Sequence, residues 1–400
     1  MKSTHPTAQS ILSSFENTET AFAYKNITEL KKARFLFGML NSFPALSTIL
    51  SKVGMQLLAW NVPFVRHSIK SIFFEHFCGG ETLEKSKPSI KMLMDFGVET
   101  VLDYGVEAKN TDKDYDITTE EFLQAIAFAG QTKGVPLISV KVTGLGSFSA
   151  LENFSKKPDS LNEKEKASLE RTEVRLIKIA TLAHDAGVSL FIDAEESWIQ
   201  PAVDHLVMNL CKRFNTEKYV ICNTYQMYLK SSFTRLKAHK EMAEEFGFIL
   251  GAKLVRGAYM DKERARAKML GYADPVQNTK VDTDEAYNKA CDFCYENVHT
   301  ISFCVASHNA KSNALLADRM IEEGNIKHPH ISFCQLYGMS DHITFNLAAI
   351  GINAMKYMPY GSVEDVFPYL ARRAEENSAV SKDAGREFKF VQKECVRRSL

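Results

Sequence analysis

The chain is 400 residues long, with 45% hydrophobic and 24% charged side chains, a composition typical of globular proteins that bury one large core or two smaller ones. Its 49 basic and 49 acidic side chains balance to zero, so net charge gives no case for a nucleic acid or polyanionic partner, and we expect a small ligand. The eight cysteines follow no framework spacing and predict buried thiols in a reducing compartment.

The first 95 residues have a helical pattern and predict an N-terminal helical arm, residues 1–95. The N-terminus lacks a signal sequence, and Glu16 and Glu19 are unlike an acid-poor transit peptide, which favours a cytoplasmic protein. The uncharged stretch Phe35–Ser51 is short for a membrane span. We expect it to pack on the domain or to lie at a membrane surface, which would place the protein on the inner face of the cytoplasmic membrane.

From Glu99 onward, short apolar runs alternate with longer amphipathic stretches, which is the pattern of βα units around a parallel sheet. The runs expected to form strands are Thr100–Val106, Leu137–Val142, Ser189–Ala194, Tyr219–Thr224, Leu250–Val255, Ser302–Ser307, Ile331–Gln335 and Ala354–Met358. A (βα)₈ barrel typically has ~250 residues, so we predict an α/β fold with a TIM-type (βα)₈ barrel over residues 96–385.

Two further segments carry predictions. The polar stretch Ser155–Lys166 predicts a loop before a helix at Ala167–Ala186. Residues 386–400 combine basic and aromatic side chains and predict a C-terminal tail that either docks as a terminal helix or contacts a membrane.

The predicted strands end in polar side chains, and the chemistry of such barrels lies at the carboxyl ends of the strands. The residues at these ends are Glu107, Lys141, Asp193, Glu195, Glu196, Gln226, Lys253, Arg256, His308, Asn309, Leu336, Tyr337 and Tyr357. Lys141 directly follows an apolar strand, and burying its charge without compensation would be costly. We therefore expect it to pair with Asp193.

After the last predicted strand, Arg372 and Arg373 lie side by side on a predicted helix. Their planar guanidinium groups could converge on one carboxylate at the flank of the helix. Glu376 follows at helical spacing and could hold either arginine. We expect Ser362 to cap this helix and Pro368 to lie in its first turn.

Several chemistries compete for these residues. Lys141 beside carboxylates fits Schiff-base chemistry, whereas Lys253–Tyr259 could run along a flavin, with Gly257 allowing close backbone approach. Residue types alone leave these two readings comparable. His328 and His330 precede the seventh strand, so metal hydrolysis is disfavoured.

Two short patterns carry little weight for a cofactor or a metal. Gly144-Leu-Gly146 lacks the third glycine of a dinucleotide fingerprint, so any FAD would not be bound in Rossmann fashion. Cys291 and Cys294 form a CxxC without a second pair, in a helical pattern, which disfavours metal or redox use.

Seven motifs follow one another along the predicted barrel: Ser139-Val-Lys-Val, Phe191-Ile-Asp-Ala-Glu-Glu, Thr224-Tyr-Gln, Lys253-Leu-Val-Arg-Gly-Ala-Tyr-Met, Ser307-His-Asn, Gln335-Leu-Tyr-Gly-Met and Tyr369-Leu-Ala-Arg-Arg-Ala-Glu-Glu-Asn. In this order they resemble the proline dehydrogenase (proline oxidase) family, in its monofunctional form. The resemblance implies a distorted barrel that holds FAD and oxidises L-proline to Δ1-pyrroline-5-carboxylate by hydride transfer to flavin N5. It further implies electron transfer to a membrane quinone and a separate pyrroline-5-carboxylate dehydrogenase downstream.

The same resemblance implies roles for individual residues. The implied substrate-binding residues are Lys141, Arg372 and Arg373 on the proline carboxylate, Leu336, Tyr357 and Tyr369 on the ring, Glu376 orienting the arginines, and Glu107 closing over Arg372. The implied FAD contacts are Gln226, Lys253, Val255, Arg256, Gly257, Ala258, Tyr259, Ser307 and His308. The implied catalytic residues are Asp193, Lys253 and Tyr357.

Two of these positions bear on specificity and on alternatives. Lys253 stands where many bacterial members carry arginine near flavin N5, so it keeps the charge but loses the bidentate fork. The bulk of Tyr357 would crowd a ring hydroxyl and favour proline over 4-hydroxyproline. The alternatives are a hydroxyproline dehydrogenase, a Schiff-base lyase that uses Lys141, and a proline sensor without turnover.

Overall fold

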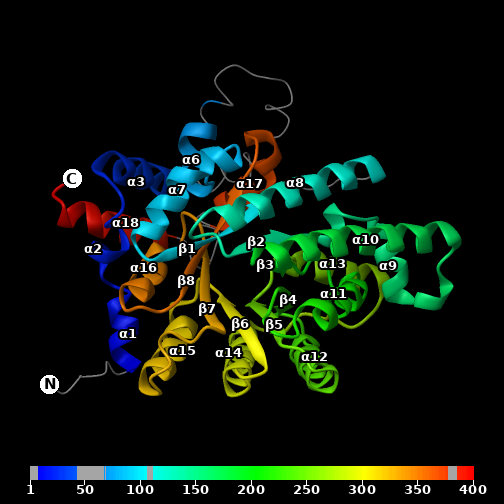
Figure 1. Cartoon of the computed structure of the whole chain (residues 1–400). Coiled ribbons are helices and arrows are strands. Elements are labelled where there is room, and N and C mark those ends of the chain that lie inside the picture. Colours follow the sequence, from blue (N-terminus) through cyan, green and yellow to red (C-terminus); the bar gives the residue numbers. More distant parts are fainter. Residues whose placement is uncertain (1–7, 43–66, 68, 106–110, 377–384) are drawn as a thin grey trace. The chain divides into compact units, whose positions relative to one another are not determined.

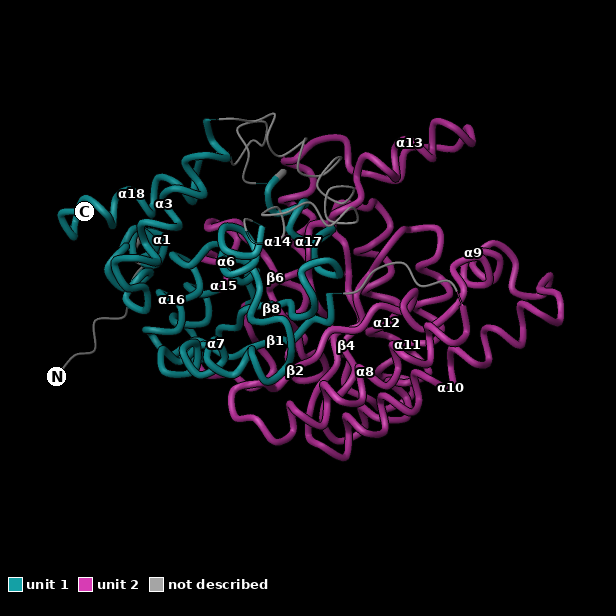
Figure 2. Tube along the Cα trace, turned by 90° about the horizontal axis from the view of Figure 1, so that it is seen from above, with its two compact units in different colours: residues 1–107, 317–326, 334–400 teal, residues 108–316, 327–333 magenta. Residues whose placement is uncertain are grey.

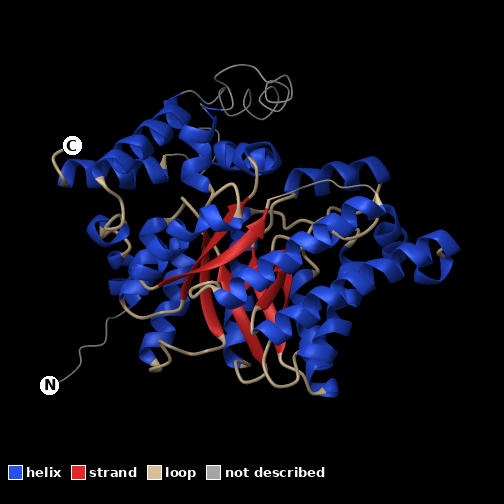
Figure 3. Ribbon diagram, turned by 45° about the horizontal axis from the view of Figure 1, so that its top comes forward, coloured by secondary structure: helices blue, strands red, loops and turns tan. Residues whose placement is uncertain are grey.

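The structure, a computed structural model, describes residues 8–42, 67, 69–105, 111–376 and 385–400. In this part of the chain, eight strands form a closed barrel in sequence order, and helices surround them (Figure 3). The strands are β1 (Val98–Tyr104), β2 (Leu137–Val140), β3 (Ser189–Ile192), β4 (Ile221–Gln226), β5 (Leu250–Val255), β6 (Ile301–Ala306), β7 (Ile331–Leu336) and β8 (Ala354–Tyr360). Parallel pairing of β1 with β8 sets Val98 opposite Ala354. The predicted (βα)₈ barrel is confirmed.

Helices precede, connect and follow these strands (Figure 1). Before the barrel lie α1 (Ala8–Ser14), α2 (Thr18–Ala21), α3 (Ile27–Ser42), the π-helix η1 (Lys70–Phe74), α6 (Glu75–Phe77) and α7 (Leu83–Asp95). The later ones are α8 (Asp112–Gln131), the 3₁₀ turn η2 (Val142–Gly144), α9 (Phe148–Lys156), η3 (Pro158–Ser160), α10 (Glu163–Ala186), α11 (Gln200–Phe214), α12 (Ser232–Phe246), α13 (Met260–Leu270), α14 (Lys280–Glu296), α15 (Ala310–Glu322), α16 (Asp341–Ala349), α17 (Val363–Glu376) and α18 (Arg386–Arg397).

The strands are where the sequence predicts them, with small shifts at their ends. β5 spans Leu250–Val255 as predicted, whereas β2 ends at Val140 because the chain turns into η2 at Val142. β1 begins at Val98 and ends at Tyr104, and the predicted end at Val106 lies outside the described residues.

Two predicted helix details are wrong. The helix expected at Ala167 begins at Glu163. The Asn162 side chain accepts a hydrogen bond from the backbone N–H of Glu165, and the Glu165 side chain accepts one from the backbone N–H of Asn162. The polar composition of this segment predicts a loop, although these residues form a capping box. Pro368 lies inside α17 rather than in its first turn. Ser362 caps this helix as predicted, since its hydroxyl accepts from the Asp365 N–H at 3.1 Å.

The chain divides into two compact units (Figure 2), and each is described by itself. Unit 1 comprises Met1–Glu107, Ala317–Ile326 and Cys334–Leu400, and unit 2 comprises Ala108–Leu316 and Lys327–Phe333. In unit 1, α18 packs against α2 and α3. Arg398, which directly follows α18, donates to the carbonyls of Phe22 and Lys25, each at 2.8 Å, so the C-terminal tail docks as a helix.

The membrane prediction concerns residues that the structure covers in part. Within the ranges described above, no helix is both long enough and apolar enough to cross a bilayer. The stretch Phe35–Ser51 begins in α3, and its second half lies outside the described residues.

A buried ion pair lies between the barrel and α16 in unit 1. The Lys356 ammonium of β8 is 2.8 Å from the Asp341 carboxylate, and the two side chains are 1% and 4% exposed. The Tyr24 hydroxyl donates to the same carboxylate at 2.7 Å, and Lys356 also donates to the Met339 carbonyl at 2.5 Å. This network therefore ties the N-terminal helices to the last strand.

Next to Asp341, His342 is buried and stacks on Phe390 at a centroid distance of 4.0 Å. Burial, with Arg386 nearby, lowers the pKa of His342 to about 3. Because an unfolded histidine has a pKa near 6.5, the unfolded chain takes up a proton below that pH that the folded chain does not. We expect the free energy of unfolding to fall by about 2 kcal/mol from pH 7 to pH 5 through this residue.

Urea unfolding at the two pH values measures this effect. His342→Gln, which cannot take up the proton, should unfold with a pH dependence smaller by that amount. The same pH dependence in the variant and the parent chain would contradict the assignment.

Candidate functional site

Three charged side chains meet in unit 2 at the carboxyl ends of its strands. The Lys253 ammonium of β5 is hydrogen-bonded and ion-paired to the Asp193 carboxylate, which directly follows β3. The Lys141 ammonium, which follows β2, is 3.8 Å from the other oxygen of that carboxylate. The Ser139 hydroxyl donates to Asp193 at 2.9 Å. The predicted Lys141–Asp193 pair is confirmed.

The electrostatics of this cluster keep Asp193 ionised. Burial alone would raise the pKa of its carboxyl group, but Lys253 and Lys141 outweigh burial and hold that pKa below its usual value. Lys253 is 5% exposed and its ammonium lies 5.0 Å from the centroid of the Phe191 ring. The sequence prediction missed the Lys253–Asp193 contact. The alternation of side chains along each strand could have indicated this contact, because inward-facing residues of β3 and β5 can meet inside a barrel.

A second contact links the segments that follow β2 and β3. The Thr143 hydroxyl donates to one oxygen of the Glu195 carboxylate at 2.5 Å, and the Thr143 N–H donates to the other at 3.3 Å. The side-chain amide of Gln226 in β4 donates to the Glu195 carbonyl at 2.7 Å. Three neighbouring strand ends are therefore held in register at this point.

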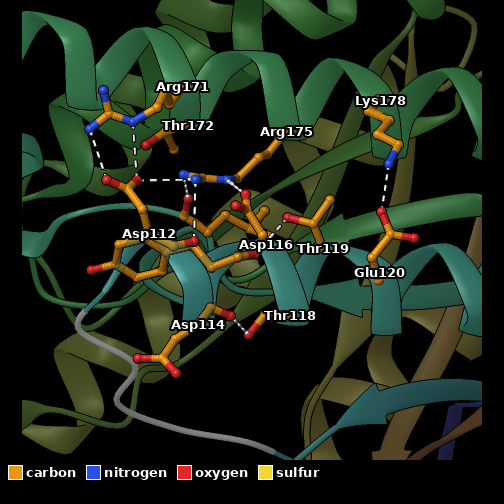
Figure 4. A network of polar contacts seen from close by, with 12 residues as sticks. Asp112, Asp114, Asp116, Thr118, Thr119, Glu120, Arg171, Thr172, Arg175 and Lys178 are labelled. Carbon is orange, nitrogen blue, oxygen red and sulfur yellow. Dashed lines mark hydrogen bonds and ion pairs between the residues drawn. The ribbon is translucent and has the colours of Figure 1, made fainter.

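The turn after β2 is also held from outside by α10. Arg175 of α10 donates to the Leu145 carbonyl at 3.0 Å and pairs with Asp112 and Asp116 of α8 at 3.1 and 2.9 Å (Figure 4). Lys178 and Glu120 extend this ladder of ion pairs between the two helices. The segment that begins with Lys141 is thus fixed to the outer helices.

The loop that follows Asp193 is locked onto α13 through three consecutive residues. Glu196 pairs with Lys262, the N–H and hydroxyl of Ser197 donate to Glu263 at 2.7 and 2.5 Å, and Arg266 lies 4.3 Å from the centroid of the Trp198 ring. Glu263 is fully buried. These contacts set the position of the loop relative to the segment after β5, and no sequence spacing indicated them.

Arg256 is held in a fixed orientation next to β5. Its guanidinium group donates to Asp284 and Ser307 at 2.6 Å each and to Ser312 at 2.9 Å, and it lies 4.3 Å from the centroid of the Tyr287 ring. Arginine has five N–H donors, so within the described part of the chain two remain after these bonds. Sequence reasoning grouped Arg256 with Ser307 but missed Asp284, Ser312 and Tyr287, which lie on the flanking helices.

The backbone after Arg256 is open to solvent. Gly257 has φ 138° and is exposed, as is Ala258. A Cβ atom at Gly257 would lie 2.0 Å from the Tyr228 ring, so this position requires glycine. Of the other residues implied to contact FAD, Val255, Tyr259 and His308 are half-buried, and Gln226 and Ser307 are buried. Open backbone, a held cation and polar strand ends fit a large, flat, anionic cofactor such as FAD.

Gly146, in contrast, serves packing. A Cβ atom there would lie 1.9 Å from the Thr172 hydroxyl oxygen of α10, so the Gly144-Leu-Gly146 pattern lets the turn approach that helix. The eight cysteines are buried free thiols, as predicted. Across the residues that the structure covers, no group of three or more histidine, cysteine or acidic residues is placed to hold a metal ion.

The arginine segment lies in unit 1. Arg373 is 7% exposed, donates to Glu376 at 2.6 Å, and its guanidinium lies 4.9 Å from the centroid of the Tyr369 ring. Glu376 thus holds Arg373 as predicted, while Arg372 is half-buried. Burial raises the pKa of Tyr369.

The remaining predicted ring contacts also belong to unit 1. Leu336 packs against the same hydrophobic core as Tyr369. Tyr357 is half-buried in β8, and its carbonyl accepts from the Tyr337 N–H at 2.9 Å. Glu107, predicted to close over Arg372, lies outside the described residues.

These features define a parallel (βα)₈ barrel in which the strand ends of unit 2 carry a buried cluster of charged side chains. The proline dehydrogenase family profile matches residues 86–386, and the chain belongs to the proline dehydrogenase family. The resemblance that the seven motifs indicated is therefore confirmed.

Three curated relatives illustrate the similarity. "Proline dehydrogenase 1, mitochondrial" of Dictyostelium discoideum is 34% identical, with 82% of this chain and 65% of the relative covered. "Carbapenem antibiotics biosynthesis protein CarD" of Pectobacterium carotovorum subsp. carotovorum is 35% identical, with coverages of 82% and 84%. "Hydroxyproline dehydrogenase" of Xenopus laevis is 31% identical, with coverages of 94% and 88%.

Among solved structures, proline utilization A from Bdellovibrio bacteriovorus, inactivated by N-propargylglycine, superimposes with a TM-score of 0.76 at 21% identity. The match covers 96% of this chain and 42% of that chain, and it supports the fold. This chain therefore spans less than half of that structure and 65% of the Dictyostelium relative.

Proposed function

We propose that the protein oxidises L-proline to Δ1-pyrroline-5-carboxylate with FAD as its cofactor, which is the first step of proline catabolism to glutamate. The observation that carries this proposal is the Asp193 carboxylate held between Lys141 and Lys253 at the strand ends, in a chain that belongs to the proline dehydrogenase family. Two cations around one anion leave a net positive charge, which suits a carboxylate substrate.

The cofactor would lie along the open backbone after β5. The residues proposed to hold it are Gln226, Lys253, Val255, Arg256, Gly257, Ala258, Tyr259, Ser307 and His308. When bound, FAD supplies a hydride acceptor at N5. The exposed backbone of Gly257 and Ala258 and the free donors of Arg256 support this placement.

The substrate carboxylate would be held by Lys141, Arg372 and Arg373, with Glu376 orienting the arginines and Glu107 closing over Arg372. Leu336, Tyr357 and Tyr369 would pack the ring. Asp193 would balance the two lysines and stay ionised while the substrate carboxylate is bound. Such a clamp fixes the carbon that loses hydride, and orientation of this kind accounts for a large part of catalytic power.

The electron acceptor and the setting of the enzyme are part of the same proposal. Electrons would pass to a membrane quinone, with the protein peripheral on the inner face of the cytoplasmic membrane. A separate pyrroline-5-carboxylate dehydrogenase would oxidise the product. Residues 1–95 would act as a helical arm, 96–385 as the FAD-binding barrel and 386–400 as the terminal tail.

Turnover with a soluble quinone tests the proposal. The purified protein, supplied with FAD, should reduce the quinone only when L-proline is present and should form one cyclic imine per quinone reduced. A protein that turns over 4-hydroxyproline but not proline would favour the alternative dehydrogenase. Trapping of Lys141 by borohydride in the presence of a carbonyl substrate would instead favour a Schiff-base lyase.

Tyr357→Ser should relax the choice between proline and 4-hydroxyproline. Removing the ring makes room for a hydroxyl group, and steric discrimination of this kind is worth about 1–3 kcal/mol, so the ratio of the two kcat/KM values should shift about 10- to 200-fold. Tyr360→Phe, in the same strand, is the matched control and should leave the ratio unchanged. An unchanged ratio in Tyr357→Ser would count against the assignment.

A further inference from the structure

Glu195 is a buried carboxyl group to which the proposed function gives no role. It lies two residues after Asp193 and is 7% exposed. Its side chain accepts two hydrogen bonds from Thr143, and Thr143 lies two residues after Lys141. The segments that follow β2 and β3 are therefore joined twice, once by Lys141 with Asp193 and once by Thr143 with Glu195.

The spacing couples the two contacts. Because Thr143 is held through both its N–H and its hydroxyl, the Glu195 carboxylate fixes the backbone from which Lys141 projects. The two bonds favour the ionised form of Glu195, since a carboxylate accepts at both oxygens. A change in the charge of Glu195 therefore alters both the position and the electrostatic surroundings of Lys141.

The charged groups that act on Glu195 are Lys141, which follows β2, and Glu196, the next residue along the chain, while Asp193 lies two residues before it. Glu196 is already paired with Lys262 of α13. Burial raises the pKa of Glu195 to about 7, against the opposing effects of the Thr143 hydrogen bonds and the Lys141 charge. The group therefore changes charge near neutral pH.

We propose that Glu195 is a positioning residue whose protonation controls how tightly Lys141 binds the carboxylate of the substrate. This inference rests on the proposed function, because it takes Lys141 as a carboxylate ligand. When Glu195 is ionised, its negative charge and that of Asp193 both attract the Lys141 ammonium. Lys141 then binds the substrate carboxylate less tightly. When Glu195 takes up a proton, that competition falls and binding tightens.

A ligand without an amine separates this effect from titration of the substrate. The probe is tetrahydrofuran-2-carboxylate, the analogue of proline with oxygen in place of the ring nitrogen, whose carboxylate stays ionised from pH 6 to pH 8.5. Calorimetry on the FAD-loaded protein gives its Kd across that range. We expect Kd to rise about tenfold with increasing pH, with a midpoint near neutrality, as expected for one added charge at short range.

Two glutamine variants decide between a specific and a general effect. Glu195→Gln removes the titration and should give a Kd that does not vary over this range. The matched control is Glu196→Gln, which removes the neighbouring carboxyl group and should keep the rise of Kd with pH, with its midpoint moved to lower pH because the charge of Glu196 helps to raise the pKa of Glu195. A Glu195→Gln protein that retains the same midpoint would overturn the inference.

Thr143→Val provides an independent test if Glu195→Gln does not fold. It removes the hydroxyl that favours ionised Glu195, so the midpoint of the Kd curve should move to higher pH, and an unmoved midpoint would overturn the inference. Failure of the proposed function gives a different result. Suppose that the parent protein binds the probe with the expected pH dependence but that L-proline does not reduce its FAD. That result supports the role of Glu195 and contradicts proline oxidation.

Discussion

Replacing Arg373 with methionine is expected to lower kcat/KM for L-proline by about 10²- to 10³-fold. Arg373 is 7% exposed, and Glu376 and the Tyr369 ring hold its guanidinium group. Loss of a desolvated, charge-assisted hydrogen bond to a carboxylate typically costs about 2–5 kcal/mol. Steady-state kinetics with a soluble quinone gives the ratio, and Arg373→Lys should fall in between, because it keeps the charge and loses the planar fork.

The control for this prediction is Arg171→Met in α10. It makes the same chemical change in an exposed ion pair with Asp112, so we expect little change in activity or in the free energy of unfolding. FAD content and the unfolding midpoint of each variant show whether the fold is kept. A well-folded Arg373→Met protein whose kcat/KM falls by less than threefold would contradict the carboxylate clamp.

Lys356→Met is expected to lower the free energy of unfolding by about 3–5 kcal/mol, because it removes the cation that contacts the buried carboxylate of Asp341. Asp341 is 4% exposed. In the variant, the Tyr24 hydroxyl would be the remaining donor to Asp341 among the contacts of this network. Urea unfolding monitored by circular dichroism gives the difference. The effect should be largest at neutral pH, where Asp341 is ionised, since Lys356 and Lys25 lower its pKa to about 2 against the opposing effect of burial.

The double variant Lys356→Met/Asp341→Asn separates the ion pair from packing. The amide keeps an acceptor for Tyr24 and removes the buried charge, so most of the lost stability should return. A double variant no more stable than Lys356→Met would show that the loss comes from packing of the lysine stem. A loss below 1 kcal/mol in the single variant would contradict the buried pair itself.

The sequence predicted the barrel well because its strands are apolar runs between amphipathic helices. Leu250–Val255 matches β5 at both ends. Parallel strands bring their carboxyl ends together, which is why Lys141 could be paired with Asp193 in advance. The cap at Ser362 and the bond from Arg373 to Glu376 follow from local helix rules, and both are present.

What the sequence did not predict depends on contacts between distant segments. Lys253 of β5 meets Asp193 after β3, with β4 between them, a contact that strand alternation permits but does not single out. Asp284 and Ser312, the partners of Arg256 on α14 and α15, follow from no spacing along the chain. Pro368 inside α17 is a different case. A proline in a helix removes one hydrogen bond, and the apolar packing of Phe367 and Leu370 on either side outweighs that cost.

The visible spectrum of the purified protein tests the central claim most directly. FAD absorbs at about 450 nm and loses that band when it is reduced. We predict that the protein carries this band and that L-proline, added without oxygen, bleaches it. A protein with the band that proline does not bleach, or one that cannot be loaded with FAD at all, would contradict the proposal that this barrel oxidises proline.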